Sequence, residues 1–469
     1  MFMIRNVHIL AKKFSRIRFI STSLPRTEEI SEKYIDEILT SDIEYNQLTN
    51  EFIPLSKSHK CLVLQPFVKW GPRKLTITPS EQLEEAVALI KTLPSWNVAD
   101  TIAVPLESLD RKTLFKSGTM ERLKNMIQKS PDITAVFVNT SNMKRVTSDI
   151  LHENFRIPIL DRYRVVIQIL KIHATTKHAK LQVALAELYF IRRKAETDRV
   201  FATADKEKLK LIFQSREQKL KKAIQRLRDE RKLLRSNRRK LDYPTVAVVG
   251  YTNAGKTCLI KALTGEKSLQ PRNQLFATLD VTVHSGVLPS GLKVLYVDTV
   301  GFLTDLPTNL LECFNATLED AVLADVILHI QDLASTCFEY KRDHVVKTLL
   351  DLGSETDDVD ITDKIFNVGN KCDLINDIKD DKLLRISAKL NIGLNELREE
   401  LEKLILKTTS RHLMTIKVEN GGHEIRWLYK NATVVSEHAD ENNSQRINAK
   451  VIITDSNLQK FKHAFLKRK

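Results

Sequence analysis

The segment GYTNAGKT, residues 250–257, limits the fold of this chain more than any other part of its sequence, because it matches the pattern G-x-x-x-x-G-K-[ST]. The apolar run TVAVV (245–249) directly precedes it, and residues 258–264 are typical of a helix. In P-loop proteins, a loop between a strand and a helix holds phosphates with its backbone amides and with the helix N-terminus. The sequence therefore predicts an α/β domain in which Lys256 reaches the β- and γ-phosphates and the Thr257 hydroxyl ligates Mg²⁺.

A second motif, NKCD at residues 370–373, concerns the nucleotide base and resembles the N-K-x-D motif of guanine-nucleotide-binding proteins. The Asp373 carboxylate can accept hydrogen bonds from N1–H and N2–H of guanine. Adenine has no such pair of donors, and an unpaired buried carboxylate is costly. SAK at 387–389 fits the companion loop, in which the Ala388 amide would donate to guanine O6. The residues expected to bind the base are Asn370, Lys371, Cys372, Asp373, Ser387, Ala388 and Lys389.

Two further segments complete the phosphate and metal site. DTVG (298–301) follows the apolar strand KVLYV, so that Asp298 would hold Mg²⁺ through water and the Gly301 amide would sense the γ-phosphate. Thr278, in FATLD (276–280), is placed to close over Mg²⁺; the alternative is an ordinary threonine at a strand edge. Lys256, Thr278 and Gly301 are the residues expected to act in hydrolysis. The expected nucleotide-binding residues outside the base motifs are Gly250, Tyr251, Thr252, Asn253, Ala254, Gly255, Lys256, Thr257, Phe276, Ala277, Thr278, Leu279, Asp280, Asp298, Thr299, Val300 and Gly301.

Phe302 stands where many GTPases carry a water-orienting glutamine. A phenylalanine cannot hydrogen-bond the attacking water, so we expect slow hydrolysis that another residue, an ion or a partner completes. Asn253 is a candidate K⁺ ligand, since asparagine fills this place in potassium-stimulated GTPases; the alternative is a hydrogen bond within the loop.

The net charge of +15 is concentrated in one segment. Residues 171–240 hold 22 lysines and arginines against 8 acidic residues, a surplus of 14. From Arg164 to Lys240 there is no proline or glycine, and apolar residues recur at helical spacing, which predicts two long antiparallel helices turning between Tyr189 and Asp205. The solvated face of a coiled coil would carry balanced charges, so the segment favours contact with RNA.

The first 27 residues contain no acidic residue, whereas arginines and lysines alternate there with apolar residues. This composition is typical of a mitochondrial transit peptide; the alternative is a basic tail without structure. Five scattered cysteines without a CxxC pair argue against disulfides and zinc. No apolar stretch approaches the roughly 18 residues of a membrane-spanning helix, so no membrane insertion is expected.

The expected organisation is α/β: a P-loop GTPase domain preceded by a small α/β domain and a long helical hairpin, with a small C-terminal α+β domain. Strands near 61–64, 101–104 and 135–139, and a helix over 80–92, indicate the first α/β domain. Alternating segments at 414–418, 432–436 and 449–454, followed by a basic helix, indicate the last. The expected limits are 1–45 for the leader, 46–163 for the N-terminal domain, 164–242 for the arm, 243–410 for the GTPase domain and 411–469 for the C-terminal domain.

The motif set resembles that of the HflX family of ribosome-associated GTPases. The segments that carry the resemblance are GYTNAGKT, LFATLD, DTVGFLTDLP, NATLED and NKCD, with ILDR (159–162) and HAKLQVAL (178–185) upstream. It covers residues 130–410 well, 60–130 weakly and 411–469 loosely. The resemblance implies binding to the large ribosomal subunit. The family's glycine-rich arm tip, similar to GGxGxRGPGE, is missing; only RRKAETDR (192–199) remains of that region, so the arm is shorter or differently tipped.

These observations predict a monomeric GTPase of the mitochondrial matrix that binds GTP or GDP with Mg²⁺, with K⁺ as a candidate second ion. Its 171–240 arm would contact the rRNA of the large ribosomal subunit. Ribosome recycling or dissociation and large-subunit assembly are alternative roles on the same platform. A GTP-bound RNA scaffold with negligible turnover is a second interpretation, supported by Phe302. An organelle signalling GTPase that acts on proteins is a third, against which the basic arm argues.

Overall fold

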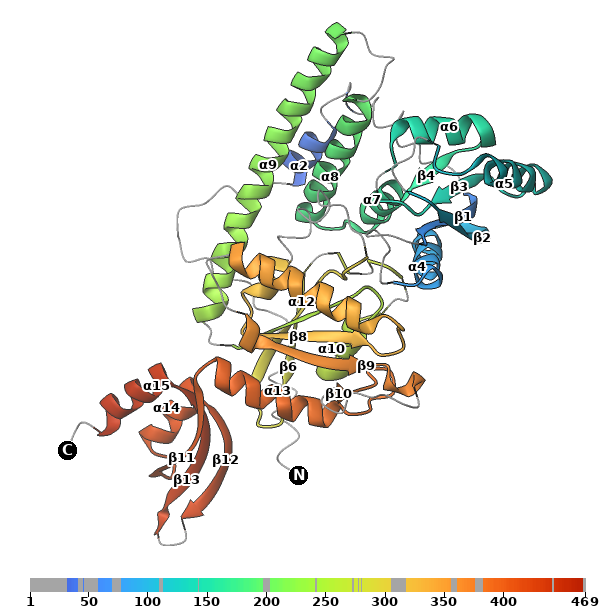
Figure 1. Ribbon diagram of the computed structural model, residues 1–469. Coiled ribbons are helices and arrows are strands. Elements are labelled where there is room, and N and C mark those ends of the chain that lie inside the picture. Colours follow the sequence, from blue (N-terminus) through green and yellow to red (C-terminus); the bar gives the residue numbers. More distant parts are fainter. Residues whose placement is uncertain are drawn as a thin grey trace.

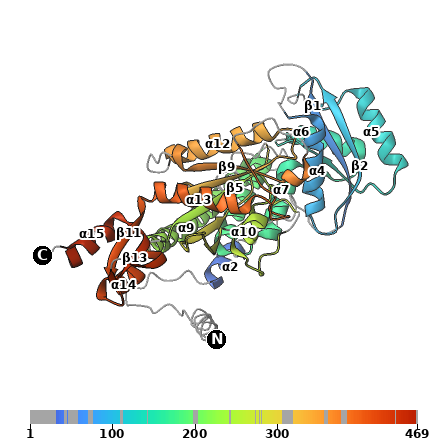
Figure 2. The same ribbon diagram turned by 90° about the horizontal axis from the view of Figure 1, so that it is seen from below.

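The chain forms an N-terminal parallel α/β domain, a helical arm, a central G domain and a C-terminal antiparallel sheet with helices (Figure 1). This confirms the fold class expected from the sequence. Figure 2 shows the N-terminal and C-terminal domains at opposite ends of the G domain. The computed structural model describes residues 32–40, 45, 58–69, 77–108, 113–141, 143–196, 203–240, 243–271, 274–276, 278–279, 281–304, 318–355, 361–375, 383–440 and 443–466.

The N-terminal domain has a four-stranded parallel sheet in the order β2-β1-β3-β4. Alternate residues of β1 enter different cores: Leu62 and Leu64 face α5 and α6, whereas Cys61 and Val63 face α4 and the arm. The expected strands and the helix over 80–92 all form. The elements are β1 (Lys60–Val68), α4 (Pro79–Thr92), β2 (Asn97–Leu106), α5 (Ser117–Lys129), β3 (Ala135–Val138), α6 (Arg145–Phe155) and β4 (Ile159–Asp161).

The arm is built of α7 (Arg162–His173), α8 (Lys177–Glu196) and α9 (Thr203–Lys240). The expected single first helix is therefore wrong: Ala174 leaves the helical conformation, and the Thr176 hydroxyl accepts a hydrogen bond from the Ala179 amide at the start of α8. α9 turns an apolar stripe toward α8 and α2, and its buried apolar members are Phe213, Leu220, Ala223 and Leu227.

A short helix, α2 (Glu32–Thr40), lies within the limits expected for the leader. Its Ile35 and Ile38 are buried in the same core as α8 and α9, and the Arg216 guanidinium donates to the Ile38 and Leu39 carbonyls. The expected limits of 1–45 for the leader therefore include a helix that packs in the same core as the arm. The basic segment of residues 1–31 lies outside the described residues.

The G domain has a six-stranded sheet in the order β10-β9-β8-β5-β7-β6, parallel except for the β6–β7 pair. α10 and α13 cover one face, and α12 covers the other. β8 had not been expected, although all of its residues except Asp332 are buried. The elements are β5 (Thr245–Gly250), α10 (Lys256–Thr264), β6 (Thr282–Val287), β7 (Lys293–Asp298), β8 (Val326–Asp332), α12 (Phe338–Glu355), η1 (Thr362–Lys364), β9 (Ile365–Asn370), η2 (Cys372–Leu374), β10 (Leu384–Arg385) and α13 (Leu394–Thr408).

The C-terminal domain is an antiparallel sheet in the order β11-β13-β12, with α14 and α15 on one face. On the other face, Ile452 packs against the G domain. The three expected strands form, but α14 had not been expected. The elements are β11 (Arg411–Glu419), α14 (His423–Asn431), β12 (Thr433–Asp440), β13 (Asn443–Thr454), α15 (Asp455–Phe461) and a π-helical turn at Lys462–Leu466. Among all the described residues, no helix combines the length and apolar character needed to cross a bilayer.

Candidate nucleotide-binding site

The P-loop leads from β5 into α10 in a conformation that its glycines permit. Gly255 has a φ of +96°, a region that L side chains rarely adopt, and a Cβ there would collide with the Asn370 side chain. A Cβ on Gly250 would collide with the Ile330 carbonyl. The loop can therefore lie between β8 and the base motif only because these two positions carry no side chain.

Lys256 lies at the first turn of α10 and is 7% exposed. Its Nζ donates to the Gly250 carbonyl at 3.2 Å and to the Tyr251 carbonyl at 2.9 Å. Burial lowers the pKa of this ammonium to about 8, and the nearby Asp298 carboxylate opposes the shift. A phosphate in the loop would supply the counter-charge that a buried ammonium needs.

Three side-chain oxygen atoms converge where a magnesium ion is expected. The Thr257 hydroxyl lies 2.7 Å from Asp298 Oδ2 and 3.1 Å from the Thr278 hydroxyl, which is itself 3.2 Å from Asp298 Oδ2. Oxygen ligands of octahedral Mg²⁺ lie roughly 3 Å apart, so the two hydroxyls have the spacing of neighbouring ligands. The structure therefore brings Thr278 next to Thr257 and Asp298, where a metal ion is expected.

Asp298 itself supports the same assignment. Its side chain is buried, and its Oδ1 has no hydrogen-bond partner among the described residues. Burial raises the pKa of this carboxyl, opposed by Lys256 and the two threonine hydroxyls. A buried acceptor without a donor fits a water of a bound cation, which would also stabilise the carboxylate. The residues present therefore fit Mg²⁺.

Gly301 follows β7 and lies against the P-loop. A Cβ there would approach Thr252 Cα to 2.8 Å and Lys256 Nζ to 2.9 Å, so only glycine brings this amide so close to the phosphate position. The next residue, Phe302, is tied to the P-loop by backbone bonds: Thr252 N donates to its carbonyl, and its own amide donates to Gly250 O. Its ring is buried near Tyr251 and His344. This ring supplies no group that could orient a water.

The base motif is held to the P-loop by Asn370. Its side-chain amide donates to the Ala254 carbonyl at 2.8 Å, and its Oδ1 accepts from the Ala388 amide at 3.0 Å. The Ala388 amide, expected to donate to guanine O6, is thus already engaged and would have to share or exchange its bond when a base binds. Lys371 forms a 2.7 Å ion pair with Asp332.

Asp332 had been missed in the sequence. It is the last residue of β8. Its position could have identified it as a site residue, because ligands bind at the carboxyl ends of the strands in α/β sheets. By pairing with Lys371, it fixes the lysine stem that is expected to pack over the base.

One cavity of about 540 Å³ joins these parts. Its size is within the range of small-molecule and cofactor sites. Cys258, Pro271, Gln274 and Leu374 also line it, although the sequence had not indicated them. The expected residues found in its wall are Thr252, Asn253, Gly255, Lys256, Thr257, Phe276, Thr278, Gly301, Asn370, Lys371, Asp373, Ser387, Ala388 and Lys389.

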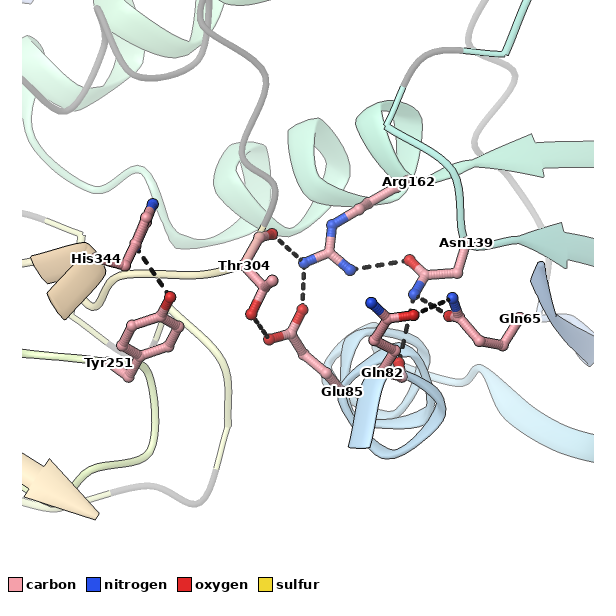
Figure 3. A network of polar contacts seen from close by, with 8 residues as sticks. All are labelled: Gln65, Gln82, Glu85, Asn139, Arg162, Tyr251, Thr304 and His344. Carbon is pink, nitrogen blue, oxygen red and sulfur yellow. Dashed lines mark hydrogen bonds and ion pairs between the residues drawn. The ribbon is translucent and has the colours of Figure 1, made fainter. Parts of the chain in front are cut away.

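The side chains of several residues expected to bind the nucleotide make contacts within the protein. The Tyr251 phenol points away from the P-loop and hydrogen-bonds His344 at 3.0 Å (Figure 3). The Thr299 hydroxyl donates to the Val248 carbonyl, and Val300 and Leu279 are buried in the core next to α12 and the arm. These four side chains fill space behind the loops that carry them, so a contact of these residues with the nucleotide would have to come from the backbone. Ala277 and Asp280 lie outside the described residues.

Comparison with known proteins gives the same picture. Residues 245–371 match the family described as "50S ribosome-binding GTPase", and residues 80–171 match the family described as "GTP-binding GTPase N-terminal". The chain is 40% identical over 429 residues to "Putative GTP-binding protein 6" of Homo sapiens, covering 88% of this chain and 82% of the relative. It is 31% identical over 385 residues to "GTPase HflX" of Caldanaerobacter subterraneus, covering 78% and 88%.

Among solved structures, the chain resembles the crystal structure of an SsGBP–GDP complex. That likeness has a TM-score of 0.43 at 22% identity and covers 74% of this chain and 99% of the other.

Proposed function

Because this chain belongs to the HflX family of GTPases, we propose that it is a GTP-dependent switch that binds the large ribosomal subunit of mitochondria. In this proposal the GTP form docks through the helical arm, and hydrolysis releases the protein. The role served by docking is ribosome recycling or dissociation, or assembly of the large subunit. The family description "50S ribosome-binding GTPase" supports the ribosomal partner.

The charge distribution on α9 carries the proposal. Its apolar stripe faces α8 and α2, whereas its lysines and arginines gather mainly on the opposite, exposed face. An extended cationic helix suits the regularly spaced phosphates of RNA, because each neutralised phosphate releases counterions. The exposed basic residues are Lys206, Lys208, Lys210, Lys219, Lys221, Lys222, Arg226 and Lys232.

Not all basic residues of α9 are available for RNA. Arg216 is buried against α2, and Arg228 forms a 2.5 Å ion pair with Glu319. These two arginines attach α9 to the rest of the protein at two points along its length. The exposed lysines are therefore carried on a helix whose orientation is set by the fold, which favours a defined footprint over non-specific attraction.

The buried ring of Phe302 is the reason to expect a slow rate of GTP hydrolysis. Without a water-orienting glutamine, the isolated protein is expected to hydrolyse GTP slowly. Asn253, exposed at the wall of the cavity with a φ of +62°, is a candidate ligand for K⁺, which would supply positive charge near the phosphates. The phenylalanine at position 302 also favours a second candidate function, a GTP-bound RNA scaffold with negligible turnover.

A multiple-turnover GTPase assay with and without purified large mitochondrial subunits separates the two functions. The switch requires that subunits stimulate a slow basal rate, by about tenfold or more if docking completes the site. Tight subunit binding without any stimulation would support the scaffold. Stimulation of the GTPase rate by tRNA, a polyanion that is not part of the large subunit, would point to general polyanion binding.

The mitochondrial location is proposed on the composition of residues 1–27, which combine six arginines and lysines with no acidic residue. Import of a reporter fused behind residues 1–31 into isolated mitochondria tests it. A version in which Arg16 and Arg18 are replaced by glutamate is the control. Import of neither fusion, or of both equally, would contradict the proposal.

A further inference from the structure

Helix α4 of the N-terminal domain contacts three loops around the nucleotide cavity of the G domain. Glu81, Glu85 and Thr92 stand at positions i, i+4 and i+11 of the helix, which places them on one face. Glu81 accepts from the amide of Cys337, between β8 and α12, at 3.1 Å. Glu85 and Thr92 contact the two segments that approach the γ-phosphate and the metal.

The middle contact is made to the loop after β7. The Thr304 hydroxyl donates to Glu85 at 2.9 Å, although 219 residues separate them in the sequence. Thr304 lies three residues after Gly301 and is 5% exposed. Because Phe302, between them, is bonded to the P-loop, a displacement of Gly301 would be transmitted to Thr304 through a short stretch of fixed backbone.

The last contact is made to the segment before Thr278. The Leu275 amide donates to the Thr92 hydroxyl at 3.3 Å, and Thr92 in turn donates to the Ala88 carbonyl of its own helix. Leu275 and Phe276 are buried beside α4 and α7. In the same structure Thr278 lies within 3.2 Å of Asp298, the arrangement expected when Mg²⁺ and a γ-phosphate are bound.

Glu85 is held in place from within the N-terminal domain (Figure 3). Arg162, which is 3% exposed, forms an ion pair with Glu85, donates to the Thr304 carbonyl at 2.6 Å and donates to Asn139 at 2.9 Å. Asn139 donates to Gln65 at 2.5 Å, and Gln65 to Gln82 at 2.8 Å. This network fixes Arg162 and Glu85 from within the N-terminal domain, since Gln65 lies in β1, Asn139 follows β3 and Arg162 follows β4.

We propose that α4 positions both nucleotide-sensing segments: Glu85, oriented by Arg162, holds Thr304, and Thr92 holds Leu275, and together they stabilise the triphosphate arrangement of the site. The N-terminal domain thereby raises the affinity for GTP relative to GDP. By reciprocity, bound GTP stabilises the N-terminal domain in this orientation, and bound GDP stabilises it less. The proposal is independent of the ribosomal partner, because it concerns the nucleotide affinities of the isolated protein.

The test is to measure the dissociation constants of GTPγS and GDP for the full-length protein carrying Thr304→Val. Valine keeps the shape of threonine and removes only the hydroxyl that Glu85 accepts. We expect GTPγS to bind about fivefold or more weakly while GDP changes less than about twofold, within the usual range of such coupling. Thr304→Ser should restore the GTPγS affinity, because it restores the hydroxyl.

Two controls separate positioning from simple domain adhesion. Glu84→Gln changes the exposed neighbour of Glu85 on the same helix and should leave both affinities unaltered. Thr92→Val removes the other contact and should reproduce the selective loss of GTPγS, which keeps the proposal testable if the Thr304 variant fails to fold. A purely structural interface would weaken both nucleotides alike. That result, or unchanged affinities in both valine variants, would overturn the proposal.

Discussion

Asp373 lies in the cavity wall beside Lys371, and its carboxylate is the group expected to select the base. The Asn370 side chain, by contrast, is buried and forms hydrogen bonds with the P-loop and with the Ala388 amide. The two ends of the motif thus differ in role: Asn370 builds the pocket, whereas Asp373 is expected to recognise guanine. This division makes Asp373 the residue whose replacement should alter specificity without altering the fold.

Asp373→Asn should weaken GTP binding by about a hundredfold or more, because guanine then loses an acceptor for its two donors. XTP should bind the variant better than GTP does, since xanthine offers a carbonyl where guanine offers an amino group. Competition of both nucleotides against a fluorescent analogue measures this. Asp363→Asn, an exposed aspartate just before β9, is the matched control. A variant that still prefers GTP would contradict the assignment.

His329 offers a prediction about pH. It is 1% exposed, its Nδ1 lies 2.8 Å from Asn367 Oδ1, and burial lowers its pKa to about 4. In the unfolded chain histidine titrates near pH 6.5. The unfolded state therefore takes up a proton first as the pH falls, and the G domain loses stability between about pH 6.5 and pH 4.

By pH 5 this loss should be about 2 kcal/mol from His329 alone. His329→Gln keeps a donor for Asn367 but does not titrate, so its G domain should lose about 2 kcal/mol less between pH 7 and pH 5. Hydrogen exchange of the β8 amides measures the local free energy of unfolding. An equal loss in both proteins would show that His329 does not contribute to acid sensitivity.

At the scale of single elements, α9 is both a structural and a candidate binding helix. Its buried residues close the core over α8 and α2, and half of its exposed residues in the described part are lysines and arginines. The two faces can be altered separately, which allows the RNA contact to be tested without disturbing the packing.

Replacing the exposed Lys219, Lys222 and Arg226 with glutamate should flatten the salt dependence of large-subunit binding. If each contacts a phosphate, the slope of log K against log salt should fall by about 2 in magnitude. The matched control reverses three exposed basic residues of α5, Arg122, Lys124 and Lys129. An unchanged slope in the α9 variant, or an equal change in the control, would count against RNA contact through the arm.

The elements also show what could be predicted from the sequence. The strand, P-loop and α10 were predictable, because the motif is local and its glycines leave few conformations. The break between α7 and α8 was not predicted, because no proline or glycine marks it. The signal was Thr176, a residue type favoured at helix N-termini, whose hydroxyl accepts from the Ala179 amide. The packing of α2 was not predictable either, because its burial depends on α8 and α9, which lie far along the chain.

The contact between the domains was beyond sequence reasoning for the same reason. Arg162 and Thr304 are 142 residues apart, and no pattern in either segment indicates the other. The family resemblance covered both segments, but a resemblance names domains and not the hydrogen bonds that join them. Only the structure brings α4 against both loops of the cavity.

At the scale of the whole molecule, nucleotide, N-terminal domain and arm are connected. The cavity loops contact α4, α4 contacts α7, and α7 continues into α8, which packs on α9. A change at the γ-phosphate therefore has a continuous packed route to the helix that presents the lysines. This arrangement suits a protein whose partner surface is selected by the bound nucleotide.

Sedimentation of the full-length protein with purified large mitochondrial subunits, in GTPγS and in GDP, tests this account most directly. The account predicts that the GTPγS form co-sediments with the subunits and that the GDP form binds about tenfold more weakly, a typical coupling between two sites. Equal binding in the two nucleotide states, or no binding in either, would contradict it.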